Sequence, residues 1–187
     1  MITGKDSNNT PATFPLDINI LASHVLPWTE VSQYFTVTGN QITGFASTGD
    51  YNLLKRCVND GITEIQLGSA TVTSIGPNVF RGSVSLSTNS CLKNVDASLI
   101  SSIGTAAFYA CPNLSFIKLG STSIGDTAFN GCKNLTIPTS GVTITGSSIG
   151  SGAFRNCQEL TYDMVANLTI ATDVLPHIVH NGTKGVA

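Results

Sequence analysis

With 187 residues, of which 41% are hydrophobic, the chain is long enough to form one domain with a buried core. Only 11% of the residues are charged and the formal net charge is -2, well below the charge content of an ordinary soluble domain. The nine basic residues are dispersed apart from the neighbours Lys55 and Arg56. The basic stripe of a nucleic-acid-binding surface is therefore missing, and we expect no nucleic-acid partner.

The N-terminal apolar stretch Phe14–Leu26 lacks the pattern of a signal peptide or a membrane span. Pro15, Asp17 and His24 interrupt it, and no cluster of basic residues precedes it. We therefore expect no membrane insertion. If an export signal has been removed from the chain, the expected location is extracellular or at a cell surface. Otherwise we expect it at the surface of a virion or another particle.

The first 60 residues divide into an arm and a cap. Residues 1–13 are polar, and we interpret them as a linker or as an arm that docks onto a partner. Phe35–Thr38 and Gln41–Phe45 alternate on either side of Gly39–Asn40, the pattern of a β-hairpin with a two-residue turn. The segment Leu53–Cys57 resembles a degenerate repeat turn.

A short phrase recurs in the middle of the chain. Ile-Gly-x-x-Ala-Phe begins at Ile103, Ile124 and Ile149, and a fainter copy begins at Ile75. Its phenylalanines follow one another at intervals of 21 to 28 residues, the spacing of a repeat protein with variable loops. In the three clear copies a cysteine follows the phenylalanine by three positions, and a leucine follows by three more. The expected structural ladder consists of Phe80, Phe108, Phe129, Phe154, Cys111, Cys132 and Cys157.

The spacing also predicts local structure. Steps of three place phenylalanine, cysteine and leucine on the inner side of a helical or 3₁₀ turn. Ile65-Gln66-Leu67 and Ile117-Lys118-Leu119 alternate as strands do, with the outer side chains buried and the middle one in solvent. Each repeat then supplies one strand and one tight turn, and each covers the apolar face of the next.

The pattern Ile-Gly-x-x-Ala-Phe-x-x-Cys-x-x-Leu, followed by a strand, resembles the BspA-like leucine-rich repeats of bacterial surface proteins. The resemblance is clear over residues 99–160 and recognisable from about residue 61, although the first copy lacks its cysteine. It implies a β-dominated α/β leucine-rich-repeat solenoid of short strands and 3₁₀ or short helical turns, with about four to five rungs and a cap at each end.

This interpretation divides the chain into four expected parts: a polar arm or linker at residues 1–13; an N-terminal cap with the hairpin and a degenerate first repeat at residues 14–60; the leucine-rich-repeat solenoid at residues 61–160; and a C-terminal cap at residues 161–187.

No pattern in the sequence predicts a metal or a cofactor. The repeated cysteines are explained as small buried side chains, and neither Cys57 nor Cys91 has the Cys-x-x-Cys partner of a zinc site. His177 and His180 are three positions apart with no third ligand nearby, so we interpret them as surface histidines.

We also expect no catalytic residues. Gly146–Gly150 matches G-x-S-x-G, but its Ile-Gly belongs to the repeat, and the strand-turn-helix context of a catalytic serine is missing. The histidines at 24, 177 and 180 lie in the flanks, away from any candidate nucleophile. We therefore expect the chain not to be an enzyme.

The first functional hypothesis is a non-enzymatic module for protein or glycan binding and adhesion at a cell or particle surface, as the resemblance implies. Gln66 and Lys118, with the loops at 81–94 and 138–148, are the candidate contacts. The alternative is a structural component of a larger assembly, such as a phage head fibre, decoration or tail protein. In that case we expect the N-terminal arm to mediate homo-oligomer formation or assembly.

Overall fold

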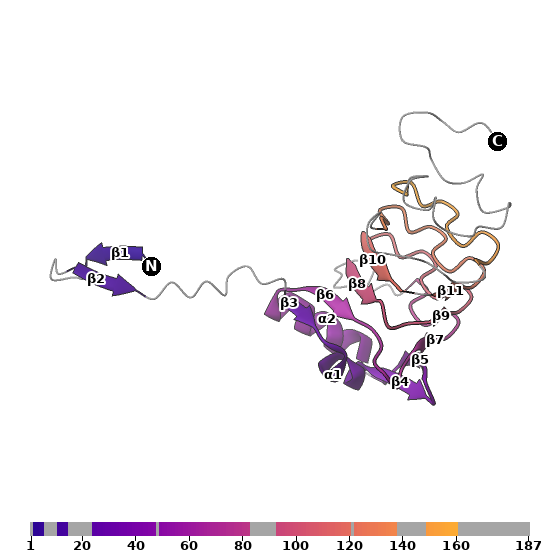
Figure 1. The fold of residues 1–187 in the computed structure, drawn as a ribbon, viewed down its shortest axis with the longest axis horizontal. Helices are drawn as coiled ribbons and strands as arrows, with labels where there is room; N and C mark the ends of the chain where they lie inside the picture. Colours follow the sequence, from indigo (N-terminus) through magenta and orange to yellow (C-terminus); the bar gives the residue numbers. More distant parts are fainter. Residues whose placement is uncertain are drawn as a thin grey trace.

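The structure, a computed structural model, describes residues 2–5, 11–14, 24–47, 49–82, 93–120, 122–137 and 149–160. Its elements in chain order are β1 (Ile2–Lys5), β2 (Pro11–Phe14), β3 (His24–Leu26), α1 (Trp28–Val31), the 3₁₀ helix η2 (Ser32–Tyr34), β4 (Phe35–Thr38), β5 (Gln41–Phe45), α2 (Gly49–Asp60), β6 (Ile62–Gln66), β7 (Ser74–Ile75), β8 (Asn94–Ala97), β9 (Ser102–Ile103), β10 (Phe116–Leu119) and β11 (Ser123–Ile124). From β3 onward the strands form two sheets, and the repeats lie one above another along them (Figure 1).

The first sheet, called here the β6 sheet, contains four parallel strands in the order β10-β8-β6-β3. Its register aligns Ile65 with Val95 and Val95 with Ile117, and all three side chains are fully buried. A further parallel bridge joins Phe116 to Thr136, so the next repeat continues the sheet. The residues on either side of this buried row point outward, as the pleat of a strand requires.

The second sheet, called here the β7 sheet, has the order β11-β9-β7-β5-β4. Ile42, Ile75, Ile103 and Ile124 form one buried row across it, and a bridge continues the row to Ile149. The strands are parallel except β4 and β5, which form an antiparallel hairpin around Gly39–Asn40. Every repeat therefore supplies one strand or bridge to each sheet.

The glycine after each repeated isoleucine is explained by the closeness of the stacked backbones. A Cβ atom added at Gly125 would lie 2.6 Å from the backbone nitrogen of Thr105. The equivalent atom at Gly150 would lie 2.3 Å from the backbone nitrogen of Asp126. Real Cβ atoms do not approach backbone so closely, so the Ile-Gly pair lets one repeat lie directly on the next.

The turns of the repeats differ from the helical or 3₁₀ turns that the spacing predicts. Each contains two residues with left-handed backbone, for example Ala106 and Ala110 with φ of 53° and 56°. The backbone N–H groups of Phe80, Phe108 and Phe129 each donate to a carbonyl of the following repeat. The left-handed residues turn alternate amides toward the neighbouring repeat, and the amides between them bond within the turn, as that of Tyr109 does to the carbonyl of Ala106. A continuous helical turn would satisfy all of its amides internally. A step of three residues places the same side chains inside in both cases, so the sequence did not distinguish them.

The four repeated phenylalanines form one column of stacked rings. The centroids of Phe80 and Phe108 are 4.7 Å apart, those of Phe108 and Phe129 are 5.2 Å apart, and those of Phe129 and Phe154 are 5.4 Å apart. The angles between neighbouring ring planes are at most 8°, and all four side chains are fully buried. The column therefore contributes both apolar burial and ring stacking between repeats.

The repeated cysteines form a second buried column beside the rings. The thiols of Cys111, Cys132 and Cys157 donate to the carbonyls of Phe80, Phe108 and Phe129, at 3.1 to 3.2 Å. All three cysteines are free. Burial raises the pKa of the Cys157 thiol to about 12, and the neighbouring Cys111 thiol together with burial raises the pKa of Cys132. The Cys132 and Cys157 thiols are thus protonated hydrogen-bond donors at neutral pH.

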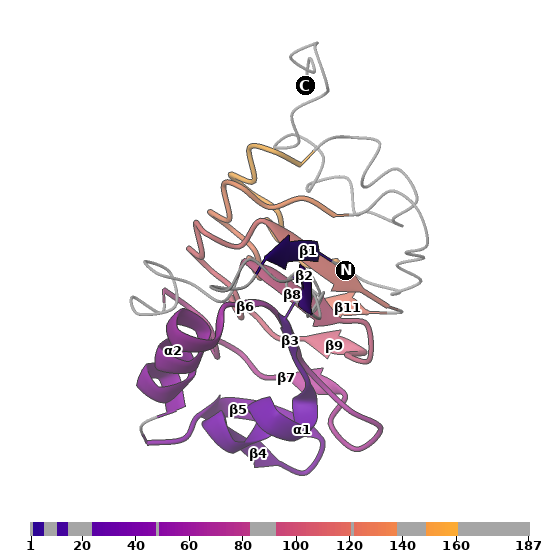
Figure 2. The same ribbon diagram turned by 90° about the vertical axis from the view of Figure 1, so that its left-hand side faces the viewer.

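The N-terminal part of the domain departs from the repeats. Where the sequence suggested a degenerate repeat turn at Leu53–Cys57, the structure has the twelve-residue helix α2. The helix occupies the place between a β7-sheet strand and a β6-sheet strand that a tight turn occupies in later repeats (Figure 2). No glycine or proline interrupts residues 50–60, so the helix continues through the segment, burying Leu53 and Cys57 one turn apart.

The remaining expected parts are described only partly. Strands β1 and β2 pair antiparallel, from Ile2 with Phe14 to Lys5 with Pro11, and no ladder among the described residues joins them to another strand. Most of the loop at 81–94, the whole loop at 138–148, Cys91 and residues 161–187 with their two histidines lie outside the described residues. No described helix has the length and apolar character needed to cross a membrane.

Candidate binding face

The outward side chains of the β6 sheet form two rows that cross its strands. In one row, the register places Gln66 beside Asp96 and Asp96 beside Lys118. The two candidate contacts found in the sequence therefore lie at opposite ends of one row, Gln66 half-buried and Lys118 exposed. The other row contains Val25, Glu64, Asn94, Phe116 and Thr136. We call these two rows together the outer β6 face.

An ion pair occupies the centre of the first row. The ammonium of Lys118 lies 3.2 Å from the carboxylate of Asp96, one strand away. The other carboxylate oxygen of Asp96 accepts hydrogen bonds from the backbone N–H, at 2.9 Å, and from the hydroxyl of Ser98. Burial alone would raise the pKa of Asp96, but the hydrogen bonds from Ser98 and Lys118 outweigh it and lower that pKa. Asp96 is therefore a fixed negative charge at neutral pH.

Glu64 lies in the neighbouring row and is in the opposite situation. Burial and the negative charge of Asp96 raise the pKa of Glu64, and the positive charge of Lys118 offsets this only in part. No ion pair engages the Glu64 carboxylate among the residues that the structure describes. The face thus holds a carboxylate whose charge is incompletely compensated, and a cation placed over it would stabilise the charged form.

The outer β6 face is neither uniformly charged nor uniformly apolar. It combines charged and amide groups with the half-buried Phe116 and with Val25, whose exposed fraction is 40%. Within the described ranges no three His, Cys, Asp or Glu side chains converge to hold a metal ion. Ile149 and Gly150, from the G-x-S-x-G match, belong to a repeat strand position and turn.

The sequence interpretation missed Asp96 and Glu64, although a signal for Asp96 was present. Val95-Asp96-Ala97 alternates in the same way as Ile117-Lys118-Leu119, with buried residues on either side of an outward one. The weaker apolar character of alanine made the alternation of this strand less distinct. Glu64 is placed outward by the same alternation, because it lies on the other side of the inward Ile65 from Gln66.

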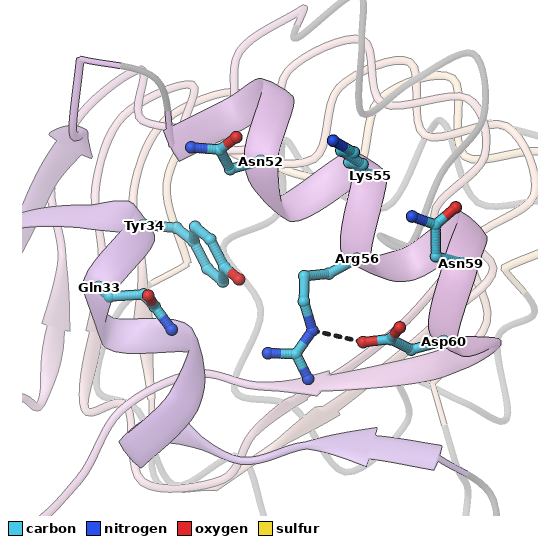
Figure 3. A pocket seen from close by; sticks show the side chains of 7 residues that line it. All are labelled: Gln33, Tyr34, Asn52, Lys55, Arg56, Asn59 and Asp60. Carbon is cyan, nitrogen blue, oxygen red and sulfur yellow. Dashed lines mark hydrogen bonds and ion pairs between the residues drawn. The ribbon is translucent and has the colours of Figure 1, made fainter.

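A polar pocket on the N-terminal part of the domain was also not foreseen. It has a volume of about 320 Å³ and is lined by Gln33, Tyr34, Asn52, Lys55, Arg56, Asn59 and Asp60 (Figure 3). The Arg56 guanidinium donates to Glu30 at 3.1 Å and to Asp60, and these hydrogen bonds raise its pKa further. The five lining residues on α2 recur at helical spacing, but this pattern could be recognised only once the segment was known to be a helix.

The repeats match a known protein family. The model of the BspA-type leucine-rich repeat region matches residues 50–172 in six copies. The match begins inside α2, so the family pattern includes the segment that the structure folds as a helix. Neither a curated protein nor a solved structure matches the chain.

Proposed function

We propose, since this chain belongs to the BspA-type leucine-rich repeat family, that it is a non-enzymatic module that binds a protein through its outer β6 face. A family of this kind suggests a protein-interaction module, because stacked repeats present extended surfaces. The single observation that carries the proposal is the row Gln66–Asp96–Lys118, which contains a salt bridge and lies beside the carboxylate of Glu64. Only 11% of the residues in the chain are charged, so three charged side chains on one face are a concentration of charge.

The chemistry of the face defines the kind of partner. Glu64 offers a carboxylate to a lysine or arginine, and Asn94 offers an amide beside it. Phe116 and Val25 lie in the same row and offer apolar contact. A protein segment with a basic side chain flanked by apolar ones would satisfy these groups together, and electrostatic complementarity would give specificity more than affinity.

The wider architecture and the location are part of the same proposal. The stacked repeats form one leucine-rich-repeat solenoid of about four to five rungs, closed by the N-terminal part with α2 and by a cap beyond residue 160. The module acts in adhesion at a cell or particle surface, because repeats of the BspA type are typically surface-associated.

Site-specific photocrosslinking tests the proposed face. A benzoylphenylalanine placed at Gln66 is expected to crosslink a surface or matrix protein, whereas the same group at the exposed Lys133 in a repeat turn is not. The captured protein, once purified, should bind the unmodified chain and lose affinity for Lys118→Glu, which places a third carboxylate beside Asp96 and Glu64. Equal crosslinking from both positions, or unchanged affinity of Lys118→Glu, would refute the proposal.

Assembly through the N-terminal arm is the second candidate. It is favoured by the β1–β2 ladder, a two-stranded sheet with unpaired edges that no described strand of the domain completes. Light scattering on the chain with and without residues 1–13 tests it. An oligomer that becomes a monomer on removal of the arm supports a particle component, and a monomer in both forms excludes this role.

A further inference from the structure

The pocket beside α2 has the construction of a separate ligand site. It lies between η2 and one side of α2, and Figure 3 shows Tyr34 and Arg56 directed toward each other across it. Gly49 brings the start of α2 close to η2: a Cβ atom there would lie 2.0 Å from the carbonyl oxygen of Tyr34. The pocket shares no lining residue with the outer β6 face.

The walls of the pocket are polar because α2 divides its side chains between two sides. Leu53 and Cys57 are buried in the core. The polar residues of the helix follow one another at steps of three and four, which places them together on the other side. They are Asn52, Lys55, Arg56, Asn59 and Asp60. An apolar ligand would gain little from such walls, since binding would desolvate polar groups without replacing their hydrogen bonds.

The charges in the pocket are nearly balanced. Arg56 is held between Glu30 and Asp60, so its positive charge is already compensated by two carboxylates. Lys55 is exposed, and neither it nor Asn59 makes a side-chain hydrogen bond or ion pair among the residues described. A small anion attracted by Lys55 would also approach the carboxylate of Asp60, which disfavours it.

The pocket therefore offers directional hydrogen bonding with little net charge. Gln33, Asn52 and Asn59 are amides, whose side chains carry donor and acceptor atoms side by side. The side-chain nitrogen of Gln33 also donates to the carbonyl oxygen of Glu30 at 2.9 Å, which holds this amide in place and leaves its oxygen to accept a hydrogen bond. Neighbouring hydroxyls of a sugar ring also donate and accept at adjacent positions. A volume of about 320 Å³ is at the small end of ligand pockets and suits one or two sugar rings.

We propose that the pocket lined by Gln33, Asn52, Asn59 and the Arg56–Asp60 pair binds a neutral carbohydrate. The amides would hydrogen-bond the ring hydroxyls, the fixed guanidinium would donate to a ring or hydroxyl oxygen, and Asp60 would accept from a hydroxyl. Lys55, at the rim, remains hydrated. The domain would then hold a sugar site on α2 in addition to the protein-binding face.

An NMR titration of the full chain tests this proposal. The probes are glucose, galactose, N-acetylglucosamine, cellobiose and lactose, with N-acetylneuraminic acid and inorganic phosphate as the charged comparison. At least one neutral sugar is expected to produce saturable shifts in the amide resonances of α2 and η2, while the charged probes produce weaker ones. Saturation by the charged probes alone, or by no probe, would overturn the proposal.

Two variants connect binding to the pocket. Asn59→Ala removes an amide that has no described side-chain partner and introduces a better helix former, so the helix is preserved. We expect its affinity for the sugar to fall several-fold, the loss typical of one hydrogen bond. Lys133→Ala, in a distant repeat turn, is the matched surface control and should bind as the unmodified chain does. Equal affinity of Asn59→Ala and Lys133→Ala would place any sugar binding outside this pocket.

Discussion

The regular repeats and the N-terminal part use the same two sheets but connect them in different ways. In the repeats the connection is a tight turn whose phenylalanine stacks on the previous one and whose amides bond to the next repeat. In the N-terminal part the connection is the helix α2, which bonds internally and leaves a polar side in solvent. Uniform turns give cohesion between repeats, whereas the irregular helix creates a pocket.

The largest expected effect comes from interrupting the phenylalanine column. Phe129→Ala removes a fully buried ring stacked between two others, and we expect it to lower the free energy of unfolding by about 3–5 kcal/mol. Phe45 is half-buried and packs edge-on against Phe80, outside the stacked column, so Phe45→Ala should cost clearly less. Denaturant unfolding of both variants measures the difference. If both variants lost the same free energy of unfolding, the stacked column in the repeats would contribute no more than the edge-on ring of Phe45.

The next largest effect is expected where the Ile-Gly pairs of neighbouring repeats are closely stacked. Gly125→Ala would place its Cβ 2.6 Å from the backbone of Thr105, so we expect a loss of about 1–3 kcal/mol from overpacking. Gly44→Ala is the control, because nothing lies within 4 Å of a Cβ added in that hairpin strand. Thermal unfolding compares the two, and a loss at Gly44 as large as at Gly125 would refute the stacking explanation.

The cysteine column predicts that the stability of the folded state falls at alkaline pH. The pKa of Cys157 is raised to about 12 from its ordinary value of 9.0, so the folded state favours the protonated thiol. Stability from this thiol is fully present below pH 9 and is lost as the pH rises toward 12. Unfolding measured from pH 7 upward should therefore show a decline that Cys157→Ala reduces. Rapid alkylation of Cys157 at pH 8 without denaturant would contradict its protection.

The smallest effect concerns Glu64. Its raised pKa means that the ionised carboxylate opposes folding at neutral pH. Glu64→Gln should increase stability at pH 7 by less than about 1 kcal/mol, because solvent screens the partly exposed carboxylate. The gain should disappear as the pH falls below the ordinary value of 4.5, where the folded and unfolded states both hold the proton. A loss of stability at pH 7 would show that Glu64 has a cationic partner in the isolated chain.

Parts of this molecule could be inferred from local residues alone. The family resemblance is confirmed by the family model, because Ile-Gly-x-x-Ala-Phe-x-x-Cys-x-x-Leu is specific in residue type and spacing. Gly39–Asn40 favours a tight turn by its own backbone preference. The left-handed residues of the repeat turns were not predicted. Glycine or asparagine, which adopt this conformation readily, occupies five of the eight positions, but alanine or threonine occupies the others, among them Ala106 and Thr127.

In the candidate sites, too, some features follow from local residues and others depend on packing between segments. Lys118 and Gln66 could be named because alternation in a strand is local, but their alignment through Asp96 depends on the register between strands. The pocket required even more information, because Gln33 and Asn59 come from different elements that only the packing of α2 against η2 brings together.

The sequence by itself determined the repeat, the residues that fill its core and the outward direction of the strand residues between them. Those properties follow from side-chain periodicity, which each segment carries alone. Only the tertiary structure decided which outward residues became neighbours, how each turn shared its amides with the next repeat, and where α2 left a polar pocket. Those properties depend on contacts between segments that are distant in the sequence, such as that joining Gln66 to Asp96.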